Sequence, residues 1–224
     1  SYLSEQRRQQ LFSLSQEDLR PYFPQPQVMQ GLFAIVKKLY GMTIEEIKGE
    51  DVWHKDVQCY CVIDEKNQVR GYVYSDLFAR PNKQGGAWMD SLQSRRQLAN
   101  GQVEVPIATL TCNFAKASKD KPATLSHDEV ITLFHEFGHC LQHLLTQVNH
   151  LGASGINGVE WDAVELPSQF FENWCWEQSA LALLTSHVET GEPLPVQLYE
   201  RLIAAKNFQS AMAMLRQMEF SLFD

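Results

Sequence analysis

The sequence predicts a mainly helical α+β fold with one small β-sheet, and three observations support this class. Apolar residues recur at helical spacing near both ends of the chain, and between them the pattern changes to the alternation typical of strands. The 224 residues are 44% apolar with only 9 Pro and 12 Gly, so the chain can bury a substantial core. No internal repeat or linker divides it. We therefore expect one unit over residues 1–224.

The first part of the chain, residues 1–50, is predicted to be helical. Ser15 and the acidic residues after it are typical of a capped short helix, which Pro21 would end. A longer helix is expected over residues 28–40, where apolar side chains recur every three or four positions. Gly41 follows it directly, as a glycine often does at a helix C-terminus.

A small sheet is expected over residues 57–114. Residues 57–63 and 69–78 are rich in β-branched and aromatic side chains, and the polar run 64–68 between them favours a hairpin turn. A third strand is predicted over residues 103–114. The paired glycines at 85–86 indicate a flexible or sharply bent connection before it.

The last part, residues 126–224, is predicted to consist of helices. Ser126 and Glu129 have the spacing of a capping box, and an apolar face follows them as far as Val148. After a glycine-containing loop, one long helix is expected over residues 164–186 and two more over 195–206 and 208–222.

The charge and cysteine content exclude several classes of function. Lys and Arg number 19 against 27 Asp and Glu, and no basic run exceeds two residues, which argues against a nucleic-acid partner. No apolar run approaches the roughly 18 residues that span a membrane, and no apolar signal core follows the N-terminus. The five cysteines form no CxxC pair, as is typical of reduced thiols in the cytoplasm. We expect a cytoplasmic location.

The motif with the clearest chemistry is His135-Glu136-Phe137-Gly138-His139. Residues four apart lie on one face of a helix, so both imidazoles can occupy adjacent corners of a zinc tetrahedron. The intervening Glu136 would then reach a water in the open corner. Zinc lowers the pKa of such a water to about 7, and a carboxylate can pass its proton to a leaving amine. The motif therefore predicts peptide-bond hydrolysis with one Zn²⁺ per chain.

A structural interpretation of the motif is two satisfied histidines on a core helix. Chance alone would produce the pattern in on the order of one or two per hundred chains of this composition. Its place on a strongly amphipathic helix with a preceding cap favours the metal interpretation.

A third protein ligand is needed, and its position separates the classes of zinc peptidase. The metzincin extension is absent, because Gln142 and Leu145 stand where it requires Gly and His. His143 would lie about 12 Å along the helix axis from His135, too far to share one ion. We expect His143 to be a surface group or a partner of a ligand. A carboxylate on a neighbouring helix is the better candidate, and Glu165 begins the next predicted helix.

Residues 135–139, together with the run 161–174, resemble the thimet oligopeptidase family of zinc peptidases. The likeness extends to residues 85–90 and 110–114. It implies a zincin-like catalytic core in which Glu165 is the third zinc ligand and Glu136 the general base. It also implies an elongated, mainly helical molecule whose deep channel admits short unfolded peptides.

Family members are about three times as long as this chain. Their C-terminal part contains a Gly- and Tyr-rich segment with a histidine that contacts the scissile carbonyl, and nothing here matches it. The resemblance therefore implies a catalytic-core fragment.

Four further positions carry weaker predictions. Glu172 lies two helical turns beyond Glu165 and could hydrogen-bond a ligand imidazole, and Asp162 is the alternative for that role. Gly138 would permit close approach of another backbone, or is simply a tolerated small residue. The strand ending at Asn113 could pair with an extended peptide by β-addition, or could be a plain structural strand.

The leading hypothesis is a monomeric, zinc-dependent metalloendopeptidase that acts on short oligopeptides, without a nucleic-acid or membrane partner. His135, His139 and Glu165 would hold the ion and Glu136 would activate the water. The alternative is a truncated, catalytically incompetent module that binds zinc and peptide.

Overall fold

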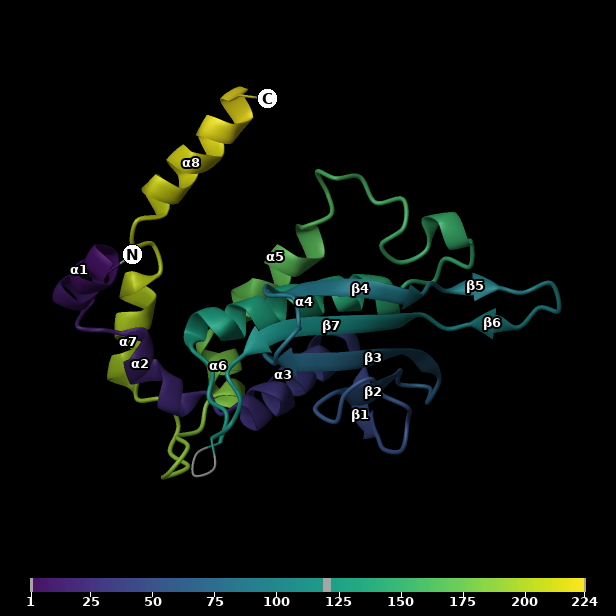
Figure 1. Ribbon diagram of the computed structural model, residues 1–224, viewed down its shortest axis with the longest axis horizontal. Coiled ribbons are helices and arrows are strands. Elements are labelled where there is room, and N and C mark those ends of the chain that lie inside the picture. Colours follow the sequence, from purple (N-terminus) through teal and green to yellow (C-terminus); the bar gives the residue numbers. More distant parts are fainter. Residues whose placement is uncertain (1, 119–121, 224) are drawn as a thin grey trace.

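The computed structural model describes residues 2–118 and 122–223. Its centre is a five-stranded sheet in the order β1-β2-β3-β7-β4, against which helices α3 and α4 pack (Figure 1). β3 and β7 are parallel, and every other neighbouring pair is antiparallel. The strands are β1 (Thr43–Ile47), β2 (Gln58–Ile63), β3 (Val69–Phe78), β4 (Trp88–Gln93) and β7 (Ile107–Phe114).

Along the chain, helices come before and after the strands of this sheet, which agrees with the predicted mixture of helices and strands. A second small sheet of β5 (Arg96–Gln97) and β6 (Val103–Glu104) extends from one end. The helices are α1 (Tyr2–Phe12), α2 (Gln16–Leu19), α3 (Gln25–Tyr40), α4 (His127–Leu144), α5 (Leu166–Glu172), α6 (Gln178–Leu184), α7 (Val196–Ala205) and α8 (Ser210–Phe223).

Several local predictions are confirmed. Ser126 and Glu129 form the capping box of α4, and Ser15 forms another with Asp18 at α2. The hairpin turn between β2 and β3 is present: Asp64 Oδ1 accepts hydrogen bonds from the amides of residues 66 and 68. Asn67 takes the left-handed conformation there, with φ of 57°, which Asn tolerates better than most residues.

Two edge strands were not predicted. β1 lies within the range 1–50 that was expected to be helical: α3 ends at Gly41, whose φ is 70°, and the chain then pairs antiparallel with β2. β4 follows the two glycines that indicated only a bend, and it pairs with β7. Both strands owe their form to pairing with a neighbour, a tertiary interaction that outweighs weak local preferences.

The predicted strand 103–114 and the predicted helix 164–186 are each interrupted. The strand divides into β6 and β7 around Pro106, which has no N–H to give to a ladder. The helix divides into α5, a 3₁₀ turn (Asn173–Cys175) and α6, with extended backbone at Glu177. The carbonyl of Cys175 bonds to His127 Nε2 at 2.8 Å instead of continuing a helix.

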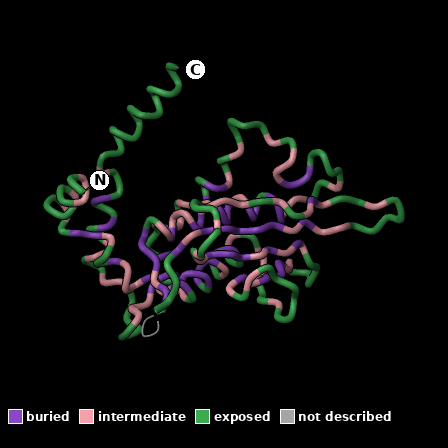
Figure 2. Tube along the Cα trace, in the orientation of Figure 1, coloured by how far each residue is buried: buried purple, intermediate pink, exposed green. Residues whose placement is uncertain are grey.

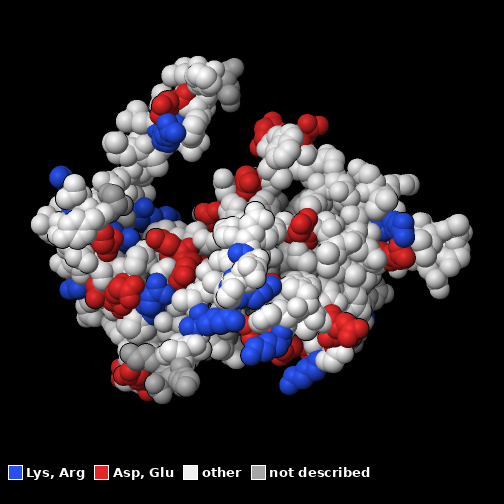
Figure 3. Space-filling model, in the orientation of Figure 1, with Lys and Arg blue, Asp and Glu red and all other residues white. Residues whose placement is uncertain are grey.

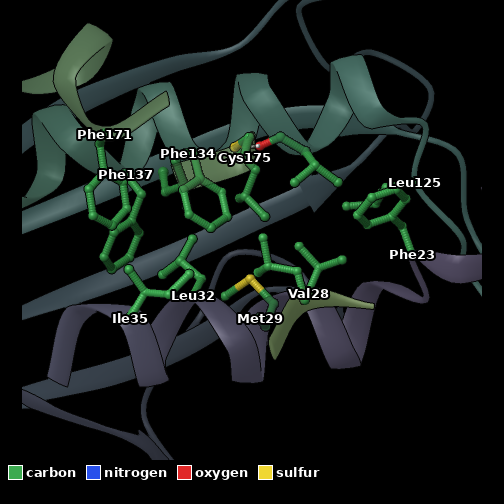
Figure 4. Packing of buried hydrophobic residues seen from close by; sticks show 14 of the residues in the cluster. Phe23, Val28, Met29, Leu32, Ile35, Leu125, Phe134, Phe137, Phe171 and Cys175 are labelled. Carbon is green, nitrogen blue, oxygen red and sulfur yellow. Dashed lines mark hydrogen bonds between the residues drawn. The ribbon is translucent and has the colours of Figure 1, made fainter. Parts of the chain in front are cut away.

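The core lies between the sheet, α3, α4 and α5. In Figure 4, Phe134 and Phe137 of α4 point toward Leu32 and Ile35 of α3, and Phe171 of α5 lies beside them. Phe134 and Phe171 stack with ring centroids 5.1 Å apart. Aromatic burial of this kind contributes much of a core's stability, so α4 is firmly placed against both neighbouring helices.

The five cysteines are all buried and free, as expected for reduced thiols. Within residues 2–118 and 122–223, no helix has both the length and the apolar character needed to cross a membrane.

Candidate metal centre

Helix α4 presents His135, Glu136 and His139 within its third and fourth turns. α5 crosses it at very close range because Gly138 has no side chain. A Cβ at Gly138 would lie only 2.6 Å from Ser168 Cα and 2.7 Å from the Pro167 carbonyl oxygen. The predicted close approach at Gly138 is therefore confirmed, and it brings the start of α5 over the two histidines.

Glu165, the residue just before α5, completes a cluster of three donor atoms. Its Oε2 lies 3.2 Å from His135 Nε2 and 3.2 Å from His139 Nε2. One donor atom from each residue lies within 4.8 Å of the other two. Ligands about 2.0–2.1 Å from a tetrahedral zinc are about 3.3 Å from each other, so two nitrogens and one carboxylate oxygen at this spacing suit that ion.

Glu172 orients one of the two imidazoles. Its Oε1 lies 2.6 Å from Nδ1 of His135. A carboxylate accepts hydrogen bonds, so Nδ1–H donates and the lone pair of His135 is left on Nε2, facing Glu165. The hydrogen bond predicted for Glu172 is therefore present, and its role beside a metal ligand stays a prediction. Asp162 is exposed in the turn before α5, and across the described residues it makes no hydrogen bond or ion pair with either histidine.

The neighbours of Glu165 lower the pKa of its carboxyl and so favour the ionised form. Ser168 Oγ donates to Glu165 Oε2 at 2.7 Å, and this hydrogen bond is the largest influence on the pKa of Glu165. Partial burial opposes it, while both histidines act with it, and the pKa is lowered overall. Burial lowers the pKa of His139, which favours the neutral imidazole that a metal requires.

Glu136 lies on the side of α4 that faces the sheet and is 8% exposed. Burial raises its pKa, Glu165 adds to the rise, and His135 and the backbone amide of Met89 in β4 oppose it. A buried carboxylate with a raised pKa is suited to accept and return a proton in general acid–base catalysis.

The strand ending at Asn113 is a structural strand, which was one of the two interpretations, and the alternative of β-addition by a peptide at this strand is wrong. The strand belongs to β7, which is already paired with β3 on one side and β4 on the other. Among the described residues, β4 is the edge strand of this side of the sheet. The sequence of residues 88–93 did not predict that this strand lies beside Glu136.

His143 is fully buried, so the expectation of a surface group is wrong. Its Nε2 lies 2.8 Å from the Gln93 carbonyl oxygen and 3.1 Å from Ser91 Oγ, both in β4. It therefore points away from the donor cluster and toward the sheet.

The chain belongs to peptidase family M3, whose family model matches residues 1–224. Within that family it is similar to oligopeptidase A of Escherichia coli K12, with 56% identity over 224 residues, which are all of this chain and 33% of the relative. The probable cytosolic oligopeptidase A of Arabidopsis thaliana is 42% identical over 229 residues, covering all of this chain and 33% of the relative. Saccharolysin of Saccharomyces cerevisiae is 36% identical over 220 residues, 95% of this chain and 31% of the relative.

The resemblance identified in the sequence is thus confirmed at the level of the family. The chain spans about a third of the length of the curated relatives that it matches. Relatives named as oligopeptidases support a peptidase role for the family's members.

Proposed function

We propose that this chain forms the metal-binding core of a zinc-dependent endopeptidase that hydrolyses short oligopeptides. The observation that carries the proposal is the convergence of His135 Nε2, His139 Nε2 and Glu165 Oε2 from two helices. A structural zinc site is usually closed by four protein ligands, often cysteines. Here three ligands converge, all five cysteines are buried elsewhere as free thiols, and a fourth position is left for water.

In this proposal, a zinc ion held by the three residues would acidify a bound water and polarise the peptide carbonyl. Glu136 would accept the proton of the attacking water at its carboxylate and return it to the leaving nitrogen. Glu172 keeps Nε2 of His135 available by accepting from Nδ1. Burial of Glu136 supports its role because it raises the pKa of the carboxyl toward neutrality.

Substrates of this site would run along β4. An edge strand binds an extended peptide through main-chain hydrogen bonds, which tolerate varied side chains. β4 lies against α4, with Met89 beside Glu136. This arrangement favours short, unfolded peptides over folded proteins, whose backbone is already paired.

The remaining parts of the proposal concern the whole protein. Residues 1–224 form one catalytic-core unit, and the protein acts in the cytoplasm as a monomer, in keeping with the relative named as cytosolic. Acidic and basic side chains lie interspersed on the face seen in Figure 3, which does not favour a nucleic-acid partner.

The test is Glu136→Gln in a chain of the relatives' length, compared with Glu160→Gln at an exposed position outside the cluster. Loss of the proton acceptor is expected to reduce peptide cleavage at least about a hundredfold while zinc content stays unchanged. Cleavage at the wild-type rate by Glu136→Gln would contradict the proposal. Assay of the 224-residue chain itself separates a peptidase core from a module that binds peptide without turnover.

A further inference from the structure

A junction of three segments lies beyond the donor cluster, at the C-terminal end of α4. Its centre is His143, one face of which meets the edge strand β4 while another meets the loop 151–158. His143 is buried completely and takes no part in the proposed chemistry. A fully buried histidine with a specific partner on another element usually has a positional reason to be there.

The partner of His143 is a backbone carbonyl at an irregularity in the sheet. The ladder between β4 and β7 shifts register between Ser91 and Gln93, and such a bulge disrupts ladder hydrogen bonds locally. At this point His143 Nε2 lies 2.8 Å from the Gln93 carbonyl oxygen. Since a carbonyl only accepts, Nε2 carries the proton and donates it, so a side chain of the metal-centre helix bonds the edge strand where its register shifts.

The other side of the His143 imidazole lies against the loop 151–158. Gly155 has a φ of 66°, and a Cβ there would collide with His143 Nδ1. Asn157 ties the same loop to the end of β4, since its Nδ2 donates to Ser94 Oγ at 2.8 Å and to the Leu151 carbonyl oxygen at 3.0 Å. His143 thus joins α4, β4 and the loop that leads toward Glu165.

The distance from His143 to Glu136 along α4 is similar to the distance between their two contact points on β4. Glu136 and His143 are seven residues apart, two turns or about 10.5 Å along one face of α4. Met89 and Gln93 are four residues apart on β4, about 13 Å of extended chain. Glu136 contacts the backbone of Met89 near one end of β4, and His143 contacts the Gln93 carbonyl at the other end. These two contacts hold the strand alongside the helix.

We infer that His143 is a positioning residue, which fixes edge strand β4 against the metal-centre helix and thereby sets where an extended peptide lies relative to Glu136. The inference about the strand stands on this geometry alone, and its consequence for substrate rests on the proposed function.

The first experiment measures amide hydrogen exchange in the 224-residue chain for wild type, His143→Leu and His143→Gln. His127→Leu is the matched control, because His127 is equally buried on α4 and bonds a carbonyl at 2.8 Å, but at the other end of the helix and away from β4. In His143→Leu, exchange of the amides of residues 88–93 is expected to rise about tenfold or more relative to those of β2. Gln, whose Nε2 can donate from a similar place, is expected to restore most of the protection.

The second experiment measures peptide cleavage in a chain of the relatives' length. His143→Leu is expected to raise KM about tenfold with less than a threefold change in kcat, since it displaces the strand that aligns the peptide and leaves the donor cluster intact. His127→Leu is expected to leave KM unchanged.

Wild-type exchange of residues 88–93 in His143→Leu would overturn the inference, as would an equal rise in His127→Leu. An unchanged KM despite faster exchange would also overturn it. If His143→Leu fails to fold, His143→Gln and His143→Asn decide: Gln is expected to protect β4, Asn to leave it exposed, and equal protection by both would contradict the donor role. Failure of the proposed function is seen separately, as retained cleavage in Glu136→Gln.

Discussion

Helices α4 and α8 are similar in length and both rich in apolar residues, yet they differ completely in burial. Eleven residues of α4 are buried, whereas none of α8 is. Figure 2 shows α8 as an exposed arm that extends from the body. Its charged residues are Arg216 and Glu219, which form an ion pair with each other. Its exposed apolar side chains are Met212, Met214, Leu215, Met218, Phe220, Leu222 and Phe223.

Apolar content thus predicts a helix but does not predict which other elements pack against it. α4 is packed because the sheet, α3 and α5 meet it on three sides, and its chemical groups are placed by that packing. In the described residues, α8 has no such neighbours. The metal-centre half of the molecule should therefore respond to mutation far more than the arm.

The largest contrast is expected between two phenylalanines. Phe134→Ala removes a fully buried ring stacked on Phe171 and should reduce the free energy of unfolding by about 3–5 kcal/mol. Phe220→Ala on α8 should change it by less than about 1 kcal/mol, since that ring is half exposed beneath Arg216. Urea unfolding of both variants measures the difference. Similar losses would show that α8 is packed in solution.

The next effect concerns the crossing of α4 and α5. Gly138→Ala places a methyl group against the backbone of Ser168 and should cost about 1–3 kcal/mol through overpacking, with weaker zinc binding because α5 and Glu165 are displaced. Gly152→Ala, at a glycine with open space around it, should change stability by less than about 1 kcal/mol. Thermal unfolding and zinc titration of the pair check this. Unchanged zinc affinity in Gly138→Ala would mean that the close crossing of α4 and α5 does not determine the position of Glu165.

The smallest effect is a dependence on pH. Burial lowers the pKa of His127, although its hydrogen bond to the Cys175 carbonyl opposes the shift. Below about pH 6.5 the unfolded chain binds a proton that the folded chain does not, so stability falls as the pH drops toward the folded pKa, by up to about 1.4 kcal/mol per pH unit.

His127→Gln can keep a donor to the carbonyl without titrating. The slope of unfolding free energy against pH between 7 and 5 should therefore be shallower in this variant than in the wild type, with the buried His143 contributing equally to both. Parallel slopes would contradict the assignment.

Local patterns in the sequence were enough to predict α4, its capping box and the hairpin before β3, because these depend on residues a few positions apart. The edge strands β1 and β4 were missed because each exists through pairing with a strand distant in sequence. The break after α5 was missed for a related reason, since it is His127, some fifty positions earlier, that bonds the Cys175 carbonyl.

In the candidate site, too, local spacing could be predicted from the sequence and contacts between distant segments could not. Helical spacing predicted that His135 and His139 share a face, and the resemblance to a family supplied Glu165, which the structure brings beside them. Their role as zinc ligands and that of Glu136 remain predictions. The burial of His143 could not be predicted, because it arises from contacts with β4 and with the loop around Gly155, both distant from α4 in sequence or without a local pattern of their own.

The most direct test of the account is the metal content of the 224-residue chain after dialysis against a weak chelator, measured by elemental mass spectrometry. The packing of α4 and α5 predicts about one zinc per chain, lost in Glu165→Ala and kept in Glu160→Ala, whose side chain is exposed before α5. Zinc retained by Glu165→Ala, or no zinc in the wild-type chain, would contradict the claim that these two helices assemble the site by themselves.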